Sequence, residues 1–167
     1  NFATVEDGRS QNMGGFARIK TLINQQLAKN PNTLLMDAGD FSMGTLVQVV
    51  YENEASELRM LGMLGMEVTT FGNHEFDYGA DGIANMLQSA IASGEKLPYM
   101  LLCNMDWDAM KAAGLTEDQT VLLEAFEDYG VRDYVVIEKG NVKIAITGVM
   151  GTNSIDCIPN LPVIFKD

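Results

Sequence analysis

Positively charged residues are scarce in this chain, which has eleven Lys and Arg against 23 Asp and Glu. The formal net charge at pH 7 is therefore −12. A protein that binds a nucleic-acid backbone needs lysine and arginine to neutralise the phosphates. The composition argues against a nucleic-acid polymer as the partner, and the acidity itself is typical of a well-solvated surface.

Cysteine and long apolar runs are also lacking. The two cysteines, Cys103 and Cys157, show no CxxC or Cys/His spacing, so neither a zinc site nor a disulfide framework is indicated. No window approaches the roughly 18 consecutive apolar residues that a membrane-spanning helix needs. A length of 167 residues and a hydrophobic fraction of 47% are those of an ordinary globular protein with one domain.

Histidine occurs once, at position 74, in the stretch that concentrates the most potential chemistry. Residues 71–79 read Phe-Gly-Asn-His-Glu-Phe-Asp-Tyr-Gly, which places an amide, an imidazole and two carboxylates between two glycines. The stretch follows an apolar run, and α/β proteins place their sites in loops that follow strands. A lone histidine is more often structural than catalytic, but this context favours a functional site.

Apolar residues recur in alternating helical and extended patterns, which predict an α/β fold. Helical spacing predicts helices over residues 16–27, 44–64 and 81–92. Short apolar runs bounded by turn formers predict buried strands over residues 33–36, 66–71 and 99–103. This order implies right-handed βαβ crossovers and a mainly parallel sheet with flanking helices.

The remaining segments are expected to be less regular. Residues 1–13 are polar and aperiodic, which predicts a loop. Residues 104–129 are interpreted as an insertion, a solvated helical excursion. Alternating apolar residues at 134–138 and 142–149 predict a β-hairpin, and no periodicity is found beyond residue 151.

Asp40 and Asn73 each follow a predicted strand, in the motifs Gly-Asp-x-x-x-Gly and Gly-Asn-His-Glu. Because neighbouring parallel strands end at one edge of the sheet, we expect the loops 37–44 and 72–79 to lie close together. Carboxylate and amide oxygens suit divalent cations, and one carboxylate can bridge two ions. If residues 73–77 form a helical turn, His74 and Asp77 share a face and the carboxylate orients the imidazole.

These motifs resemble the second and third motifs of the calcineurin-like metallophosphoesterases. More narrowly, Gly39–Gly44 and Gly72–Gly79 are similar to those of the 5′-nucleotidase and 2′,3′-cyclic-nucleotide phosphodiesterase branch, as are the flanking Gly14–Ile19 and Leu34–Asp40. The resemblance extends over roughly residues 12–104, and weakly over residues 142–151. It implies an α/β metallophosphoesterase-type βαβ sandwich that ends here in a C-terminal β-hairpin.

The resemblance also implies roles at four positions. Asp40 is expected to bridge two divalent metal ions, such as Zn²⁺ or Mn²⁺, and Asn73 to bind the second ion. His74 is expected to contact the phosphoryl group and stabilise its developing charge, with Asp77 paired to it. The implied reaction is hydrolysis of phosphate esters, above all nucleotides, by metal-activated water.

Two features of the family are not found in this sequence. The family's first strand ends in Asp-x-His and later strands supply further histidines, whereas His74 is alone here. We therefore expect residues 1–167 to be one partial metallophosphoesterase domain of a longer protein, binding metal poorly and inactive by itself. The resemblance further implies a C-terminal substrate-binding domain and an extracellular, periplasmic or cell-surface location.

Other interpretations stay open at this level. The chain is also consistent with a degenerate or truncated phosphoesterase-like module that binds a ligand without turnover, and with a related sulfur-ester hydrolase. Among the neighbouring polar residues, Asp37 is expected to support the turn and Arg18 to lie at the surface or in a salt bridge. Glu75 fits equally a supporting partner of the site and a residue that is solvated or braces a loop.

Overall fold

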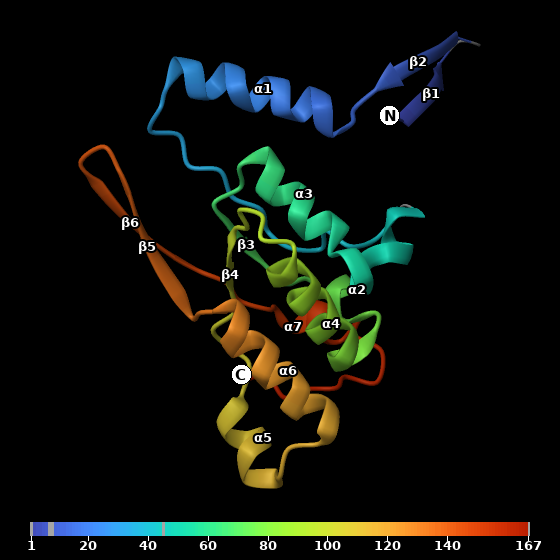
Figure 1. Cartoon of the computed structure of the whole chain (residues 1–167), viewed down its shortest axis with the longest axis vertical. Coiled ribbons are helices and arrows are strands. Elements are labelled where there is room, and N and C mark those ends of the chain that lie inside the picture. The colour runs from blue at the N-terminus through green and yellow to red at the C-terminus, as the bar shows by residue number, and fades with distance from the viewer. Residues whose placement is uncertain (1, 7–8, 45, 167) are drawn as a thin grey trace. The chain divides into compact units, whose positions relative to one another are not determined.

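The computed structural model describes residues 2–6, 9–44 and 46–166 and divides the chain into two compact units, residues 1–34 and 35–167. In the first unit, β1 (Phe2–Glu6) pairs antiparallel with β2 (Arg9–Met13), and α1 (Phe16–Lys29) follows (Figure 1). The predicted first helix is confirmed. The predicted loop over residues 1–13 is wrong, because backbone pairing forms a hairpin here without an alternating apolar pattern.

Parallel segments lie side by side in the second unit. β3 (Val68–Thr70) pairs in parallel with β4 (Tyr99–Leu101), which confirms two predicted strands in shortened form. Single parallel bridges add Met36 beside Val68 and Arg132 beside Leu101. The prediction of a buried strand over residues 33–36 is wrong in extent: only Met36 forms a bridge, and its side chain is exposed.

The segment predicted as one helix over residues 44–64 forms three short ones. These are the 3₁₀ helix η1 (Leu46–Val50), α2 (Tyr51–Glu54) and α3 (Ser56–Leu64), while Thr45 lies outside the described residues. The chain breaks at Ala55, whose backbone φ of 45° is left-handed. The sequence does not reveal this break, because alanine favours helix and the apolar residues keep a helical spacing on both sides of position 55.

The C-terminal half contains α5 (Trp107–Ala113), α6 (Glu117–Tyr129) and the short α7 (Thr152–Ile155). α6 begins at a capping box in which Thr116 and Gln119 exchange hydrogen bonds. The expectation of a solvated excursion is wrong, because α6 packs against α4 (Gly79–Ala92) and contributes to the core.

The predicted hairpin is confirmed. β5 (Tyr134–Lys139) pairs antiparallel with β6 (Val142–Thr147), with Tyr134 opposite Thr147. Beyond β6, the carbonyl oxygen of Gly148 accepts a hydrogen bond from the backbone N–H of Cys103, 2.9 Å away. The hairpin is thereby continuous with the segment that follows β4.

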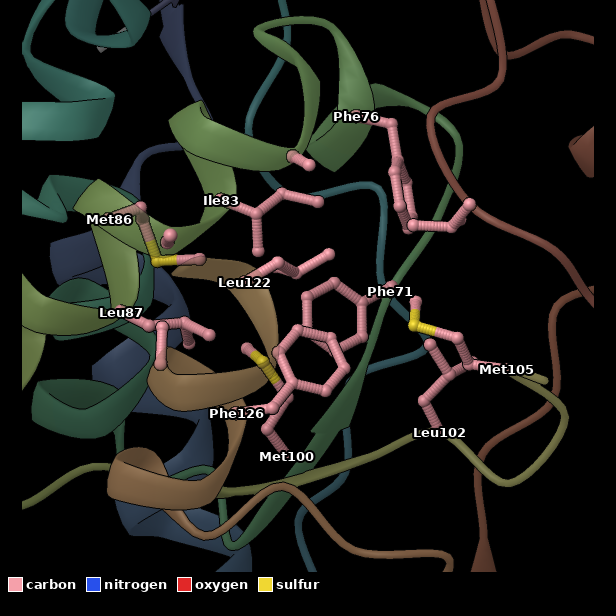
Figure 2. Packing of buried hydrophobic residues seen from close by; sticks show 14 of the residues in the cluster. Phe71, Phe76, Ile83, Met86, Leu87, Met100, Leu102, Met105, Leu122 and Phe126 are labelled. Atoms are coloured by element: carbon pink, nitrogen blue, oxygen red, sulfur yellow. The ribbon is translucent and has the colours of Figure 1, made fainter. Parts of the chain in front are cut away.

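The core of the second unit lies where α4 and α6 meet the end of β3. Figure 2 shows side chains of α4 and α6 converging on Phe71, whose ring stacks on Phe126 with centroids 5.3 Å apart. Phe71 is the residue directly before the Gly-Asn-His-Glu motif, so the core holds the base of that loop. Among the described residues, no helix combines the length and apolarity needed to cross a membrane.

Candidate active site

The two motif loops lie against each other, as predicted. Met36 and Val68 are paired, so the loops that follow them leave the same edge of the sheet. The backbone N–H of His74 donates a hydrogen bond to Oδ1 of Asp40, 3.2 Å away. Residues 34 positions apart in the sequence therefore share one site.

Two glycines allow this approach. A Cβ on Gly39 would lie 2.7 Å from the backbone nitrogen of Gly72, and one on Gly72 would lie 2.5 Å from Oδ1 of Asp40. Real Cβ atoms do not come so close to backbone or carboxylate atoms, so neither glycine can be replaced without moving the two loops apart. The glycines in both motifs are needed for the contact between the loops.

Asp40 has an uncommon backbone conformation. Its φ is 64°, in the left-handed region that aspartate and asparagine tolerate better than most residues. Strained backbone of this kind persists only where its surroundings hold it, and it is concentrated at functional sites. The conformation coincides with the residue for which the sequence predicts metal binding.

Glu75 supplies much of the support for both loops. Its side chain has 0% relative exposure, and its two oxygens accept four backbone hydrogen bonds at 2.6–3.1 Å. The donors are the N–H groups of Asp40, Phe41 and Ser42 in one loop and Gly72 in the other. Burial raises the pKa of Glu75, and these hydrogen bonds act in the opposite direction. The burial of Glu75 excludes a solvated role, and its contacts brace the Asp40 loop as well as its own.

His74 and Asp77 form the predicted pair. They lie in and directly after the 3₁₀ helix η2 (His74–Phe76), and Nδ1 of His74 is 3.0 Å from Oδ2 of Asp77. An ionised carboxylate only accepts hydrogen bonds, so in this pair Nδ1 carries the proton and Nε2 remains for a ligand. Both side chains are partly exposed, at 34% and 21%, so solvent and solutes reach them.

The other polar residues take the places expected of them. Oδ2 of Asp37 accepts hydrogen bonds from the N–H of Gly39 and the hydroxyl of Thr69, which confirms its role in the turn. Arg18 lies on α1 and donates to the carbonyl oxygen of Gly14. Asn73 directly precedes η2 and is partly exposed.

Tyr51 was not predicted to take part. It is buried in α2, and its hydroxyl donates a hydrogen bond to the backbone carbonyl of Glu75, 3.1 Å away. No spacing in the sequence links position 51 to the motif. The contact depends on how α2 packs beside α4, which local patterns do not show.

The donor atoms at this edge suit a divalent cation. Asp40 offers a carboxylate and Asn73 an amide oxygen, which are ligands that Mg²⁺, Mn²⁺ and Zn²⁺ accept. Within residues 2–6, 9–44 and 46–166, no group of three or more His, Cys, Asp or Glu side chains is arranged to hold a metal ion. Metal binding by Asp40 and Asn73 therefore stays a prediction.

The geometry thus places Asp40, Asn73 and the His74–Asp77 pair together at one end of the parallel strands. The chain belongs to the calcineurin-like phosphoesterases, whose family model matches residues 11–160. This confirms the resemblance stated from the two motifs. Proteins of this family use divalent metal ions.

Individual relatives agree with the family. A 5′-nucleotidase of Rattus norvegicus is 39% identical in an alignment over 129 residues that covers 66% of this chain and 22% of that protein. The trifunctional nucleotide phosphoesterase protein YfkN of Bacillus subtilis is 25% identical in an alignment over 163 residues that covers 90% of this chain and 11% of that protein. The chain thus spans about a fifth or less of the length of these two relatives.

The fold is also that of a solved relative. The crystal structure of a 5′-nucleotidase precursor from Thermus thermophilus superposes with a TM-score of 0.71 at 24% identity, covering 99% of this chain and 29% of that one. The predicted α/β fold of metallophosphoesterase type is therefore confirmed.

Proposed function

We propose that this chain forms part of the catalytic site of a metal-dependent phosphoesterase that hydrolyses nucleotides. The observation that carries the proposal is the contact of the Asp40 loop with the His74 loop, beside the His74–Asp77 pair. The relatives named as nucleotidases and nucleotide phosphoesterases support a nucleotide as the substrate. Two bound divalent ions would polarise the phosphoryl oxygens and activate the attacking water.

Each of the four residues has a distinct part in this proposal. Asp40 would bridge the two ions and Asn73 would bind the second, since their oxygens lie on adjoining loops. Nε2 of His74 would donate a hydrogen bond to a phosphoryl oxygen as negative charge develops there. Asp77 would hold the ring in place through Nδ1 and stabilise its positive charge.

The wider setting is proposed on the same basis. The relatives are several times longer than this chain. This supports a longer protein in which residues 1–167 form part of one phosphoesterase domain and a separate C-terminal domain binds the substrate. An extracellular, periplasmic or cell-surface location is proposed by analogy with this branch of the family.

The natural full-length protein, assayed with and without Mn²⁺ or Zn²⁺ on nucleoside monophosphates and cyclic nucleotides, tests the proposal. We expect His74→Ala to lower kcat about 100- to 1,000-fold, the cost typical of removing one donor to the transition state. Asp77→Asn should lower kcat less, because the imidazole remains. Asp40→Asn should weaken Mn²⁺ binding, because the bridging carboxylate becomes an amide.

Asp118→Asn is the matched control, since it makes the same change at an exposed carboxylate on α6. It should have the wild-type kcat and KM. Wild-type rates in both His74→Ala and Asp40→Asn would contradict the mechanism. Mn²⁺ binding without hydrolysis of any of these esters would favour the binding module instead.

A further inference from the structure

Glu75 is a fully buried carboxylate for which the proposed reaction has no direct use. It is 0% exposed, and its four hydrogen-bond donors are all backbone N–H groups. Three of these, from Asp40, Phe41 and Ser42, are consecutive in the chain. Consecutive N–H groups that converge in this way form a concavity that binds an anion. Here the anion is a side chain from the other motif loop.

The hydrogen bonds act on the residue with the strained backbone. Asp40 has a φ of 64°, and its own N–H donates to Oε2 of Glu75 at 2.8 Å. The same oxygen accepts the N–H of Gly72 at 2.6 Å, so one atom ties the two loops together. The side chain of Asp40 meanwhile accepts from the N–H of His74. Glu75 therefore holds the main chain of Asp40, while the carboxylate of Asp40 is directed at the second loop.

We propose that Glu75 is a positioning residue: it fixes the backbone of residues 40–42 and thereby sets where Asp40 presents its carboxylate beside His74. Both of its oxygens are needed. Glutamine has the same shape but replaces one acceptor by an NH₂ group, which would face N–H donors on whichever side it lies. Aspartate keeps both acceptors but is one methylene shorter, so it cannot reach both loops equally well.

Hydrogen–deuterium exchange of the full-length protein tests the bracing directly, without a metal ion or a substrate. In the wild type, the amides of Asp40, Phe41, Ser42 and Gly72 should be protected, because their acceptor is buried. Wild-type exchange at these amides as fast as in an open loop would overturn the proposal, and this measurement requires no variant to fold. Glu75→Gln should accelerate their exchange, and Glu75→Asp should do so to a smaller extent.

Mn²⁺ affinity and kinetics separate positioning from general stabilisation. We expect Glu75→Gln to weaken Mn²⁺ binding about 10- to 100-fold, the usual effect of losing a support behind a ligand. At saturating Mn²⁺, kcat should fall with KM near its wild-type value, and Glu75→Asp should recover part of the loss. Folding of each variant is checked by circular dichroism.

Glu57→Gln is the matched control. Glu57 is also a buried glutamate, at 8% exposure, but it lies in α3 and accepts its hydrogen bond from the hydroxyl of Ser56 in the same helix. It should leave exchange at residues 40–42 and Mn²⁺ affinity unchanged. If Glu75→Gln only lowers stability, with Mn²⁺ affinity and kcat as in the wild type, positioning is refuted.

The consequence for kinetics rests on the proposed function, but the bracing does not. Full-length protein that binds Mn²⁺ and hydrolyses no phosphate ester would contradict the proposed function, while the exchange and affinity comparisons would still decide the role of Glu75. The other outcome is a wild-type protein that hydrolyses nucleotides, with amides at residues 40–42 and 72 that exchange equally fast in the wild type and in Glu75→Gln. It would contradict only the role proposed for Glu75.

Discussion

Gly72 is constrained by space and not by an unusual backbone angle. A Cβ there would lie 2.5 Å from Oδ1 and 2.7 Å from the backbone nitrogen of Asp40, and neither atom is free to move away. Forcing an extra methyl group into a packed contact typically costs about 1–3 kcal/mol. We expect Gly72→Ala to lower the free energy of unfolding by about this amount in urea denaturation.

Gly151→Ala is the control for this change. Gly151 has an ordinary φ of −75°, and a Cβ there would meet no atom within 4 Å. Its free energy of unfolding should change by less than about 0.5 kcal/mol. Equal losses in the two variants would show that the loops are not in close contact at Gly72.

The contacts that the sequence predicts at this scale are local or follow from strand order. His74 and Asp77 are three residues apart, so a single turn brings them together, and adjacent parallel strands bring Asp40 to their edge. The bracing by Glu75 was only one of two equal alternatives. Tyr51 was missed, since its contact with Glu75 depends on helix packing.

At the scale of elements, α4 links the candidate site to the core. It begins at Gly79, the last residue of the motif, and packs against both α2 and α6. Ile83 on its inner face is 0% exposed, and Figure 2 shows it beside Leu122 of α6. Truncation of such a buried side chain removes apolar burial and leaves a cavity. We expect Ile83→Ala to lower the free energy of unfolding by about 2–5 kcal/mol.

Ile91 offers the same substitution in the same helix. Its side chain is 40% exposed, so Ile91→Ala removes the same atoms with a smaller loss of packing. We expect a loss of under about 1 kcal/mol in the same urea titration. A loss at Ile91 equal to that at Ile83 would mean that α4 does not present Ile83 to the core as described.

Elements with strong signals of their own were predicted well, as α1, α4 and the β5–β6 hairpin show. The errors arise where long-range packing or an uncommon backbone conformation determines the structure of a segment. Ala55 adopts a left-handed conformation that no residue signal marks, and the β1–β2 hairpin pairs polar segments. α6 was expected to be solvated because an Asp- and Glu-rich face concealed Leu122 and Phe126, which are buried.

For the molecule as a whole, family membership followed from very few residues. The motifs at 39–44 and 72–79 were sufficient because the chemistry demands those residue types, and the family match extends over residues 11–160. The match gives the family and its use of divalent ions, but the two motifs do not identify a complete set of metal ligands or a substrate pocket. Short motifs thus define the family of the protein better than its specificity.

The stability of the second unit should fall at alkaline pH because of Tyr129. Its hydroxyl donates to the carbonyl oxygen of Pro98, 2.8 Å away, and burial raises its pKa. The unfolded chain loses this proton above about pH 10 while the folded chain keeps it, so the contribution is complete below pH 10 and declines above it. Urea unfolding at about pH 8 and about pH 11 should show a smaller loss of stability for Tyr129→Phe than for the wild type.

Tyr134→Phe is the control, because Tyr134 is an exposed tyrosine on β5, and this variant should lose as much stability as the wild type between the two pH values. Equal losses for Tyr129→Phe and the wild type would exclude Tyr129 as a source of the pH dependence.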